Sequence, residues 1–303
     1  MYGNPVGIKT GYIKKTWLDS LKNYIEVTKP RSVFLLVFTA LGTMFLAASI
    51  YGMTTAVFIK SLLAITLACS GVNAVSCYVD RDIDAVMERT KHRPIPSGRI
   101  APPVKALIWG LAQFVLALFI AYSLNMPSFV CIFLGMLGYV GIYSLLFKRK
   151  TAWNIILGGF SGGLPAMFGW TAVAGRIELL PVLVSLLVVL WIPNHIWNLA
   201  IFYKDDYRKV GVPMLPVVCE TRRTLFYILA TVLAMFALSV WIYFAGNLGA
   251  FYLVVAVVCG LAITAGNMFL LFNTEQKRFW LLYKLSSPYL FLLFLAMMLD
   301  VYL

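Results

Sequence analysis

Apolar residues along this chain fall in runs of about 20, and short polar patches separate the runs. An α-helix needs about 20 such residues to cross a bilayer hydrocarbon core of about 30 Å. Windows of about 19 residues predict nine transmembrane helices, at residues 32–52, 56–79, 104–124, 128–147, 153–174, 179–202, 224–245, 249–272 and 281–302. The pattern predicts an all-α, polytopic membrane protein whose nine helices form a single bundle.

Composition excludes the soluble classes of protein. Of the 303 residues, 61% are hydrophobic and 12% are charged, whereas soluble domains carry roughly 25% charged residues. The five cysteines stand singly and mostly inside apolar runs, a pattern unlike a disulfide scaffold. No linker or low-complexity tract interrupts the chain. We therefore expect one transmembrane domain over residues 1–303.

The distribution of basic residues predicts the orientation in the membrane. Of the 25 Lys and Arg residues, 21 precede the first predicted helix or lie in the even-numbered connections, at 80–103, 148–150, 203–223 and 273–280. Cytoplasmic loops are rich in Lys and Arg. The pattern therefore predicts a protein of the cell membrane with segment 1–31 in the cytoplasm and the C-terminus outside.

The N-terminal residues and the net charge of +13 invite two other interpretations. Residues 1–30 carry several lysines but no apolar core followed by a cleavage site, so we expect no signal peptide. Residues 12–28 predict a short helix at the membrane surface. The basic residues lie in separate patches and not in one stripe, so we expect a lipid bilayer and no nucleic acid as partner.

Two long connections, 80–103 and 203–223, are predicted to be cytoplasmic active-site loops. Together they contain seven of the twelve acidic residues, and loops of such length are usually functional. Each follows an even-numbered helix, and four helices separate them along the chain. This spacing suggests an internal pseudo-repeat whose two copies face each other across the bundle.

In the first loop, Asp80, Asp84 and Glu88 are spaced four residues apart. A continuing helix would place them on one face, where like charges repel each other. Mg²⁺ fits such a site, because it binds through one or two carboxylates and takes its other oxygens from water and substrate phosphates. The alternative interpretation is a solvated loop that is neutralised by its own ion pairs. Basic side chains that could neutralise a diphosphate are Arg81, Arg89, Lys91 and Arg93.

The second loop repeats this mixture of carboxylates and basic side chains. Its candidate residues are Tyr203, Lys204, Asp205, Asp206 and Tyr207. If the two loops face each other, they make one metal-bridged diphosphate site at the cytoplasmic end of the bundle.

A histidine inside a transmembrane helix is a functional candidate by default. His195 precedes Asp205 by ten residues, which is roughly 15 Å along a continuous helix. An imidazole at that depth would lie too far from a diphosphate at the acidic loops to contact it. The alternative interpretation is a histidine that only ties its helix to a neighbour.

The run DRDIDAVMERTKHRPIPSG, from Asp80 to Gly98, resembles the first aspartate-rich motif of the UbiA superfamily of intramembrane prenyltransferases. Within that family it is most similar to the branch whose acceptor is haem. Further similar stretches are residues 28–31, residues 147–151 together with 154–170, and residues 204–207 together with 211–216.

The resemblance implies a nine-helix bundle, Mg²⁺ as cofactor, farnesyl diphosphate as donor and haem B as acceptor. The product would be haem O, formed by transfer of a farnesyl group to a haem vinyl group with addition of water. By the same resemblance, Asp80, Asp84 and Asp206 would hold metal, Asp205 would complete the second acidic motif, and Arg89 and Arg93 would line the diphosphate site.

The resemblance also implies roles for several substrate-binding residues. Lys148 and Arg149 would be basic helpers. His195 matches a histidine of the haem-directed branch, and together with its depth in the helix this implies that it serves the acceptor and not the diphosphate. Ser76 stands where the family usually has Asn, with Asn73 one turn earlier, and either side chain offers an oxygen.

Three alternative functions remain at this point. A related prenyltransferase would use a quinone precursor or a lipid alcohol as acceptor. A secondary transporter would have its ion sites near the bilayer midplane, at broken helices, whereas the acidic residues here lie at cytoplasmic helix ends. A purely structural assembly factor would not need two acidic clusters placed in this way.

Overall fold

The computed structural model describes residues 17–301 and 303. Within this part of the chain, nine helical spans are long and apolar enough to cross a membrane, which confirms the prediction. They are α2 (Pro30–Tyr51), α3 (Thr55–Val79), α5 (Val104–Tyr122), α6 with η1 (Met126–Phe147), α7 (Asn154–Ala174), α8 (Leu179–Phe202), α11 (Thr221–Ala245), α12 (Ala250–Leu270) and α13 (Gln276–Asp300).

The fourth span differs from a regular α-helix in its second half. Helix α6 (Met126–Met136) continues into the π-helix η1 (Leu137–Phe147). Hydrophobicity alone does not distinguish the two, because both belong to one continuous apolar run. Wider π-type turns occur frequently at functional sites, and η1 carries Tyr139 and Tyr143 to the wall of the cavity described below.

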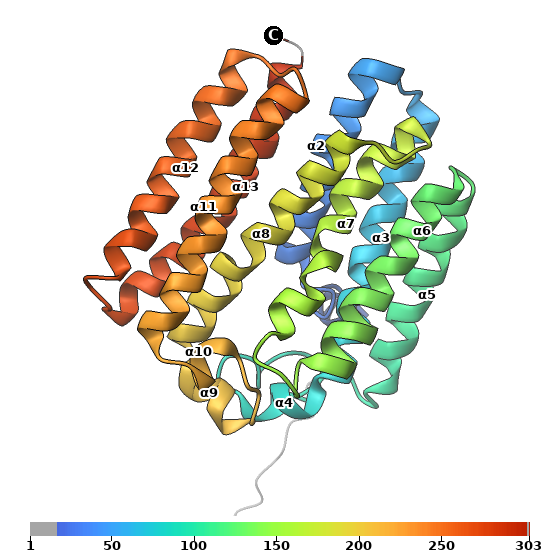
Figure 1. Ribbon diagram of the computed structural model, residues 1–303. Helices are drawn as coiled ribbons and strands as arrows, with labels where there is room; N and C mark the ends of the chain where they lie inside the picture. The colour runs from blue at the N-terminus through green and yellow to red at the C-terminus, as the bar shows by residue number, and fades with distance from the viewer. Residues whose placement is uncertain (1–16, 302) are drawn as a thin grey trace, which may run out of the picture.

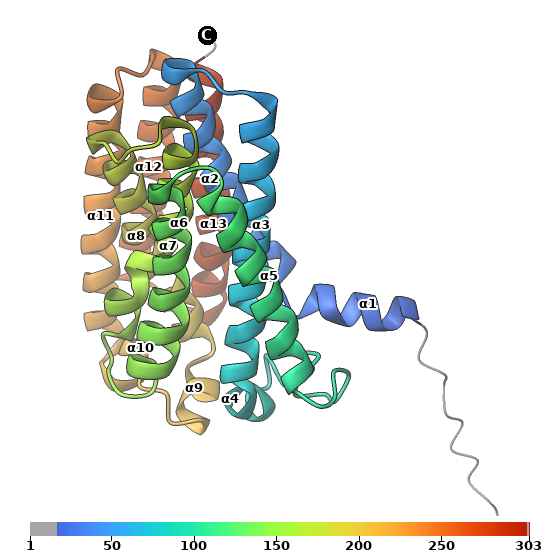
Figure 2. The same cartoon turned by 90° about the vertical axis from the view of Figure 1, so that its right-hand side faces the viewer.

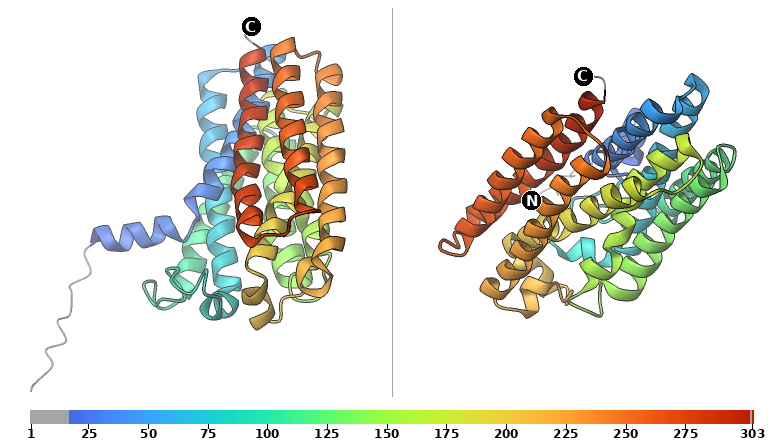
Figure 3. Two further views of the ribbon diagram at one scale, coloured as in Figure 1. Left: turned by 90° about the vertical axis from the view of Figure 1, so that its left-hand side faces the viewer. Right: turned by 45° about the horizontal axis from the view of Figure 1, so that its top comes forward.

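Four spans form a closed ring at the centre of the bundle. Helix α7, the most buried span, contacts both α2 and α8, and α13 completes the ring by contacting α8 and α2. Helices α11 and α12 pack outside α8 and α13, and α5 packs against α3. Figures 1 and 3 show the spans running side by side between the two ends of the bundle.

Three short helices gather at one end of the bundle, opposite the C-terminus (Figure 1). They are α4 (Arg81–Val86), α9 (Lys204–Lys209) and α10 (Leu215–Val218), and all belong to the two long acidic connections. Helix α3 ends at Val79, and Asp80 lies between α3 and α4. Asp80, Asp84 and Glu88 therefore do not share one continuous helical face, and Glu88 lies beyond the end of α4.

Helix α1 (Trp17–Glu26) extends sideways from the bundle (Figure 2). Its exposed apolar residues are Trp17, Leu18, Leu21 and Ile25. The guanidinium of Arg99, in the first acidic connection, pairs with Glu26 at 2.5 Å and anchors the inner end of α1. This geometry suits the predicted helix at the membrane surface, although residues 12–16 of that prediction lie outside the described residues.

Candidate active site

The first acidic motif contributes two buried carboxylates, and each is paired with a basic side chain. Asp80 is 5% exposed, and Lys148 Nζ lies 2.5 Å from its Oδ2. Asp84 is 4% exposed, and Arg93 Nη1 lies 2.7 Å from its Oδ2. The site therefore contains the ion pairs of the alternative interpretation, but in a buried setting and not in a solvated loop.

The second acidic motif meets the first through Asp206 and Arg89. The backbone N–H of Arg89 donates to Asp206 Oδ2 at 3.2 Å, across 117 positions of sequence. The Arg89 guanidinium lies 5.6 Å from the centre of the Tyr203 ring. Asp206 and Tyr207 are buried, while Tyr203 and Lys204 are half-buried. The two acidic loops thus contact each other, as the sequence predicts.

Asp205 does not share this environment. Its side chain is 82% exposed, and it pairs with Arg208 at 2.7 Å on the surface of α9. Adjacent residues on a helix point in directions about 100° apart, because a turn holds 3.6 residues. Burial of Asp206 therefore turns Asp205 outward, and the structure brings only one of the two adjacent aspartates into the site.

Three further predicted residues also point away from the buried carboxylates. Arg81 donates to the Tyr78 carbonyl oxygen at 2.7 Å. Lys91 pairs with Glu88 at 2.6 Å on the surface. Arg149 makes two bonds of 2.7 Å to Asp82, and these bonds lower the pKa of Asp82 to about 2. Lys91 and Arg149 are thus neutralised by acidic partners at the surface, and none of the three residues lines the cavity.

Lys29 also belongs to the site, although it was not among the candidate residues predicted from the sequence. It precedes α2 with φ 55° and ψ 63°, a left-handed conformation that is strained for a residue other than glycine and disfavoured before proline. Its Nζ donates to Ser76 Oγ at 3.4 Å. Burial disfavours its charge, yet Cys77, Tyr139 and Asp80 outweigh burial and raise the pKa of Lys29. The sequence signal that could have identified Lys29 is its position directly before Pro30, at the start of a span.

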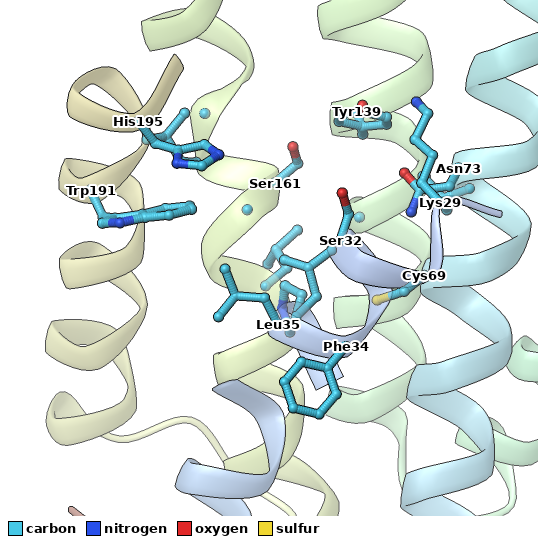
Figure 4. Close-up of a pocket in the computed structure, with 18 of the residues that line it drawn as sticks. Lys29, Ser32, Phe34, Leu35, Cys69, Asn73, Tyr139, Ser161, Trp191 and His195 are labelled. Atoms are coloured by element: carbon cyan, nitrogen blue, oxygen red, sulfur yellow. The ribbon is translucent and has the colours of Figure 1, made fainter. Parts of the chain in front are cut away.

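A cavity of about 730 Å³ extends from Lys29 into the bundle between α2, α3, α6, η1, α7, α8 and α13. Most of its lining is apolar, as is usual for ligand pockets of about 300–1,000 Å³. Figure 4 shows Lys29, Asn73 and Tyr139 on one side of the pocket and Trp191 and His195 on the other. The cavity therefore has a polar wall facing an aromatic one.

The aromatic wall holds His195 in a fixed orientation. Its ring lies 4.4 Å from the centre of the Trp191 ring and 4.5 Å from that of Tyr283. Its Nδ1 lies 2.6 Å from Ser286 Oγ on α13. Helix α8 runs without interruption to Phe202, so His195 lies deeper in the bundle than Asp206, which follows the end of this helix. His195 does contact a neighbouring helix, and it also lines the cavity.

Several buried polar atoms near the carboxylates have no hydrogen-bond partner. Among the described residues these atoms include Asp80 Oδ1, Asn73 Nδ2 and Arg89 Nε. An unpartnered buried polar atom costs about 1–3 kcal/mol. The set combines an anionic acceptor with two donors, which suits a ligand carrying both a cation and phosphate oxygens.

The described residues contain no group of three His, Cys, Asp or Glu side chains arranged to hold a metal ion. Asp80, Asp84 and Asp206 therefore do not form one closed protein cage: Lys148 and Arg93 pair with the first two, and Asp206 accepts from the Arg89 backbone N–H. Mg²⁺ does not require such a cage, since it commonly uses one or two carboxylates together with water and substrate phosphates. The carboxylates present fit an open magnesium site of this kind.

Relatives and solved structures resemble this chain over nearly its whole length. It is 54% identical over 294 residues to a protein of Desulforudis audaxviator named protoheme IX farnesyltransferase, covering 97% of this chain and 93% of the relative. It is 38% identical to a protein of the same name from Symbiobacterium thermophilum, covering 93% of this chain and 94% of the relative.

The fold is shared with solved members of one family. A digeranylgeranylglyceryl phosphate synthase structure superposes with a TM-score of 0.76 at 19% identity, covering 93% of this chain and 99% of the other. A UbiA homologue from Archaeoglobus fulgidus bound to DMAPP and Mg²⁺ superposes with a TM-score of 0.64 at 15% identity, covering 89% and 99%. The sequence profile of the UbiA prenyltransferase family matches residues 35–298. This chain therefore belongs to the UbiA prenyltransferase family.

Proposed function

We propose that this protein transfers a farnesyl group from farnesyl diphosphate to a vinyl group of haem B, giving haem O and diphosphate. The single observation that carries the proposal is one apolar cavity that begins at Lys29, beside the paired carboxylates of the acidic loops, and has an aromatic wall containing His195. The 54% identity to a protein named protoheme IX farnesyltransferase supports the choice of substrates.

The donor would bind with its diphosphate at the polar mouth and its isoprenoid chain in the apolar interior. Lys29, Arg89, Arg93 and Lys148 supply the positive charge that faces the phosphates. Asp80 and Asp84, with Asp206 from the second loop, would hold Mg²⁺. When bound, the metal supplies further positive charge to the diphosphate oxygens as they become the leaving group.

The reaction begins with cleavage of the allylic C–O bond, and the bonding electrons leave with the diphosphate. The basic side chains stabilise this developing negative charge. The haem vinyl group then attacks the farnesyl cation and forms the new C–C bond. Water adds to the resulting cation next to the porphyrin ring and loses a proton, which leaves the hydroxyl group of haem O. An apolar cavity limits premature capture of the farnesyl cation by water.

The acceptor separates this proposal from its alternatives. A quinone precursor or a lipid alcohol would not need an imidazole held between two aromatic rings in the cavity wall. A transporter would have no use for a donor site that releases diphosphate. Purified protein with Mg²⁺, haem B and farnesyl diphosphate is expected to give haem O by mass spectrometry. Diphosphate release without any haem adduct would contradict the proposed acceptor.

The proposed acceptor role predicts the behaviour of a His195→Ala variant. We expect this variant to bind haem more weakly and to form no detectable haem O, because the cavity loses its only imidazole among the described residues. Binding of farnesyl diphosphate with Mg²⁺ should persist, since His195 lies away from the carboxylates. A histidine that only packs α8 against α13 would instead lower stability and both binding activities together.

We also propose that the end of the bundle carrying α4 and α9 faces the cytoplasm, with the C-terminus on the outer side. Single cysteines introduced at His92 and Lys209, in a background without the native cysteines, should react only with reagent that reaches the cytoplasm. A cysteine at Arg176 is the matched control, because this exposed residue lies in the connection between α7 and α8 at the opposite end. Outer-face labelling at 92 or 209 would reverse the orientation.

A further inference from the structure

Ser286 on α13 lies behind His195, with its hydroxyl oxygen within hydrogen-bond distance of one ring nitrogen. Ser286 is fully buried, its Oγ donates to the Tyr283 carbonyl oxygen at 2.7 Å, and His195 Nδ1 lies 2.6 Å from the same Oγ. A serine hydroxyl has one hydrogen and two acceptor lone pairs. With that hydrogen given to Tyr283, the hydroxyl keeps its lone pairs to accept from an Nδ1–H of the imidazole.

The same residue also fixes the position of the rings around His195. The Trp191 indole Nε1 donates to the Ser286 carbonyl oxygen at 2.7 Å. The Trp191 ring then stacks on His195 at an interplanar angle of 22°. Both the rotation of the imidazole and the face on which it stacks therefore depend on contacts to Ser286.

This arrangement leaves Nε2 as the ring nitrogen that carries a lone pair. A neutral imidazole has one N–H and one acceptor nitrogen. His195 lines the cavity, and Figure 4 shows its ring pointing from α8 into the pocket. With Nδ1 turned to Ser286, Nε2 cannot donate a hydrogen bond to a porphyrin carboxylate. It can bind a metal ion.

We infer that Ser286 is a positioning residue that presents Nε2 of His195 as an axial ligand to the iron of the haem substrate. This inference rests on the proposed function. Histidines that bind metals almost always donate their other N–H to a neighbouring group, and loss of that group typically weakens metal affinity by about 10–100-fold. Iron ligation would hold the macrocycle at one depth in the cavity while a vinyl group reacts.

The test is a haem titration of the full-length protein without farnesyl diphosphate, followed by absorption and electron paramagnetic resonance spectra. We expect an imidazole-ligated spectrum for the wild type. Ser286→Ala should lose much of that signature and bind haem about 10-fold more weakly. Ser286→Thr retains the hydroxyl and should restore both. Ser239→Ala is the matched control, because Ser239 is equally buried and donates to the Phe236 carbonyl oxygen at 2.7 Å, but lies on α11, which does not line the cavity in the described part of the chain.

The outcomes separate this inference from the proposed function. In His195→Ala the ligated spectrum should disappear and return when free imidazole is added. Wild-type spectra and affinity in Ser286→Ala would overturn the role of Ser286. A ligated spectrum that survives His195→Ala would overturn the iron ligand. In both cases, haem O formation by the wild type would leave the proposed function intact.

A wild type that neither binds nor converts haem would overturn the proposed function itself. Each variant is first checked by size-exclusion chromatography.

Discussion

Asn in place of Asp80 or Asp84 is expected to reduce haem O formation by about 100-fold or more, with the protein still folded. Each change removes a negative charge that would bind Mg²⁺ and leaves a half-buried cation, Lys148 or Arg93, without its partner. Loss of one group that stabilises transition-state charge commonly costs about 10²–10³-fold in rate. Turnover at several Mg²⁺ concentrations checks this, with size-exclusion elution as the measure of folding.

The second acidic motif offers a matched pair for the same experiment. Asp206→Asn should impair turnover severely, because Asp206 is 7% exposed and joins the two loops through Arg89. Asp205→Asn makes the identical chemical change at the next residue, where the side chain is exposed and pairs with Arg208 on the surface. We expect it to retain most activity. Equal losses in both variants would contradict the assignment of Asp206, and near wild-type rates for Asp80→Asn and Asp84→Asn at limiting Mg²⁺ would contradict the metal site.

Gly169→Ala is expected to have the largest effect on folding. A Cβ atom at Gly169 would occupy the space of the Ala40 carbonyl oxygen and the Thr43 hydroxyl on α2. Backbone atoms cannot rotate away as a flexible side chain can, so α2 and α7 would have to separate. Overpacking of a well-packed interior costs about 1–3 kcal/mol, occasionally more, and we expect the upper part of that range. Thermal unfolding in detergent measures the loss.

The control is the same substitution at a glycine with open space around it. A Cβ at Gly135, in α6, meets no atom within 4 Å. Since alanine favours helix over glycine by about 1 kcal/mol, Gly135→Ala should leave the unfolding temperature unchanged or raise it slightly. An equal loss of stability in both variants would show that the α2–α7 contact is not the cause.

Hydrophobic patterning alone determined the nine spans. Each span must satisfy its backbone hydrogen bonds within one helix, and its side chains must form an apolar run long enough to cross the bilayer. The alternation of the connections likewise placed both acidic loops at one end of the bundle. The motif around Asp80 and Asp84 identified the family, and the comparison with known relatives confirmed it. These features depend on composition and spacing along the chain, so they can be read from it directly.

Only the tertiary structure decided which member of each charged cluster enters the site. Asp206 and not Asp205 is buried, and Lys148 meets Asp80 across 68 positions of sequence. Lys29, which was not predicted, lies in the site, and Arg81, which was predicted, does not. Helix ends and packing, and not residue type, set the direction of each side chain. The pairing of His195 with Ser286 spans 91 positions. Such contacts depend on how α8 and α13 pack against each other, and no local sequence pattern predicts that packing.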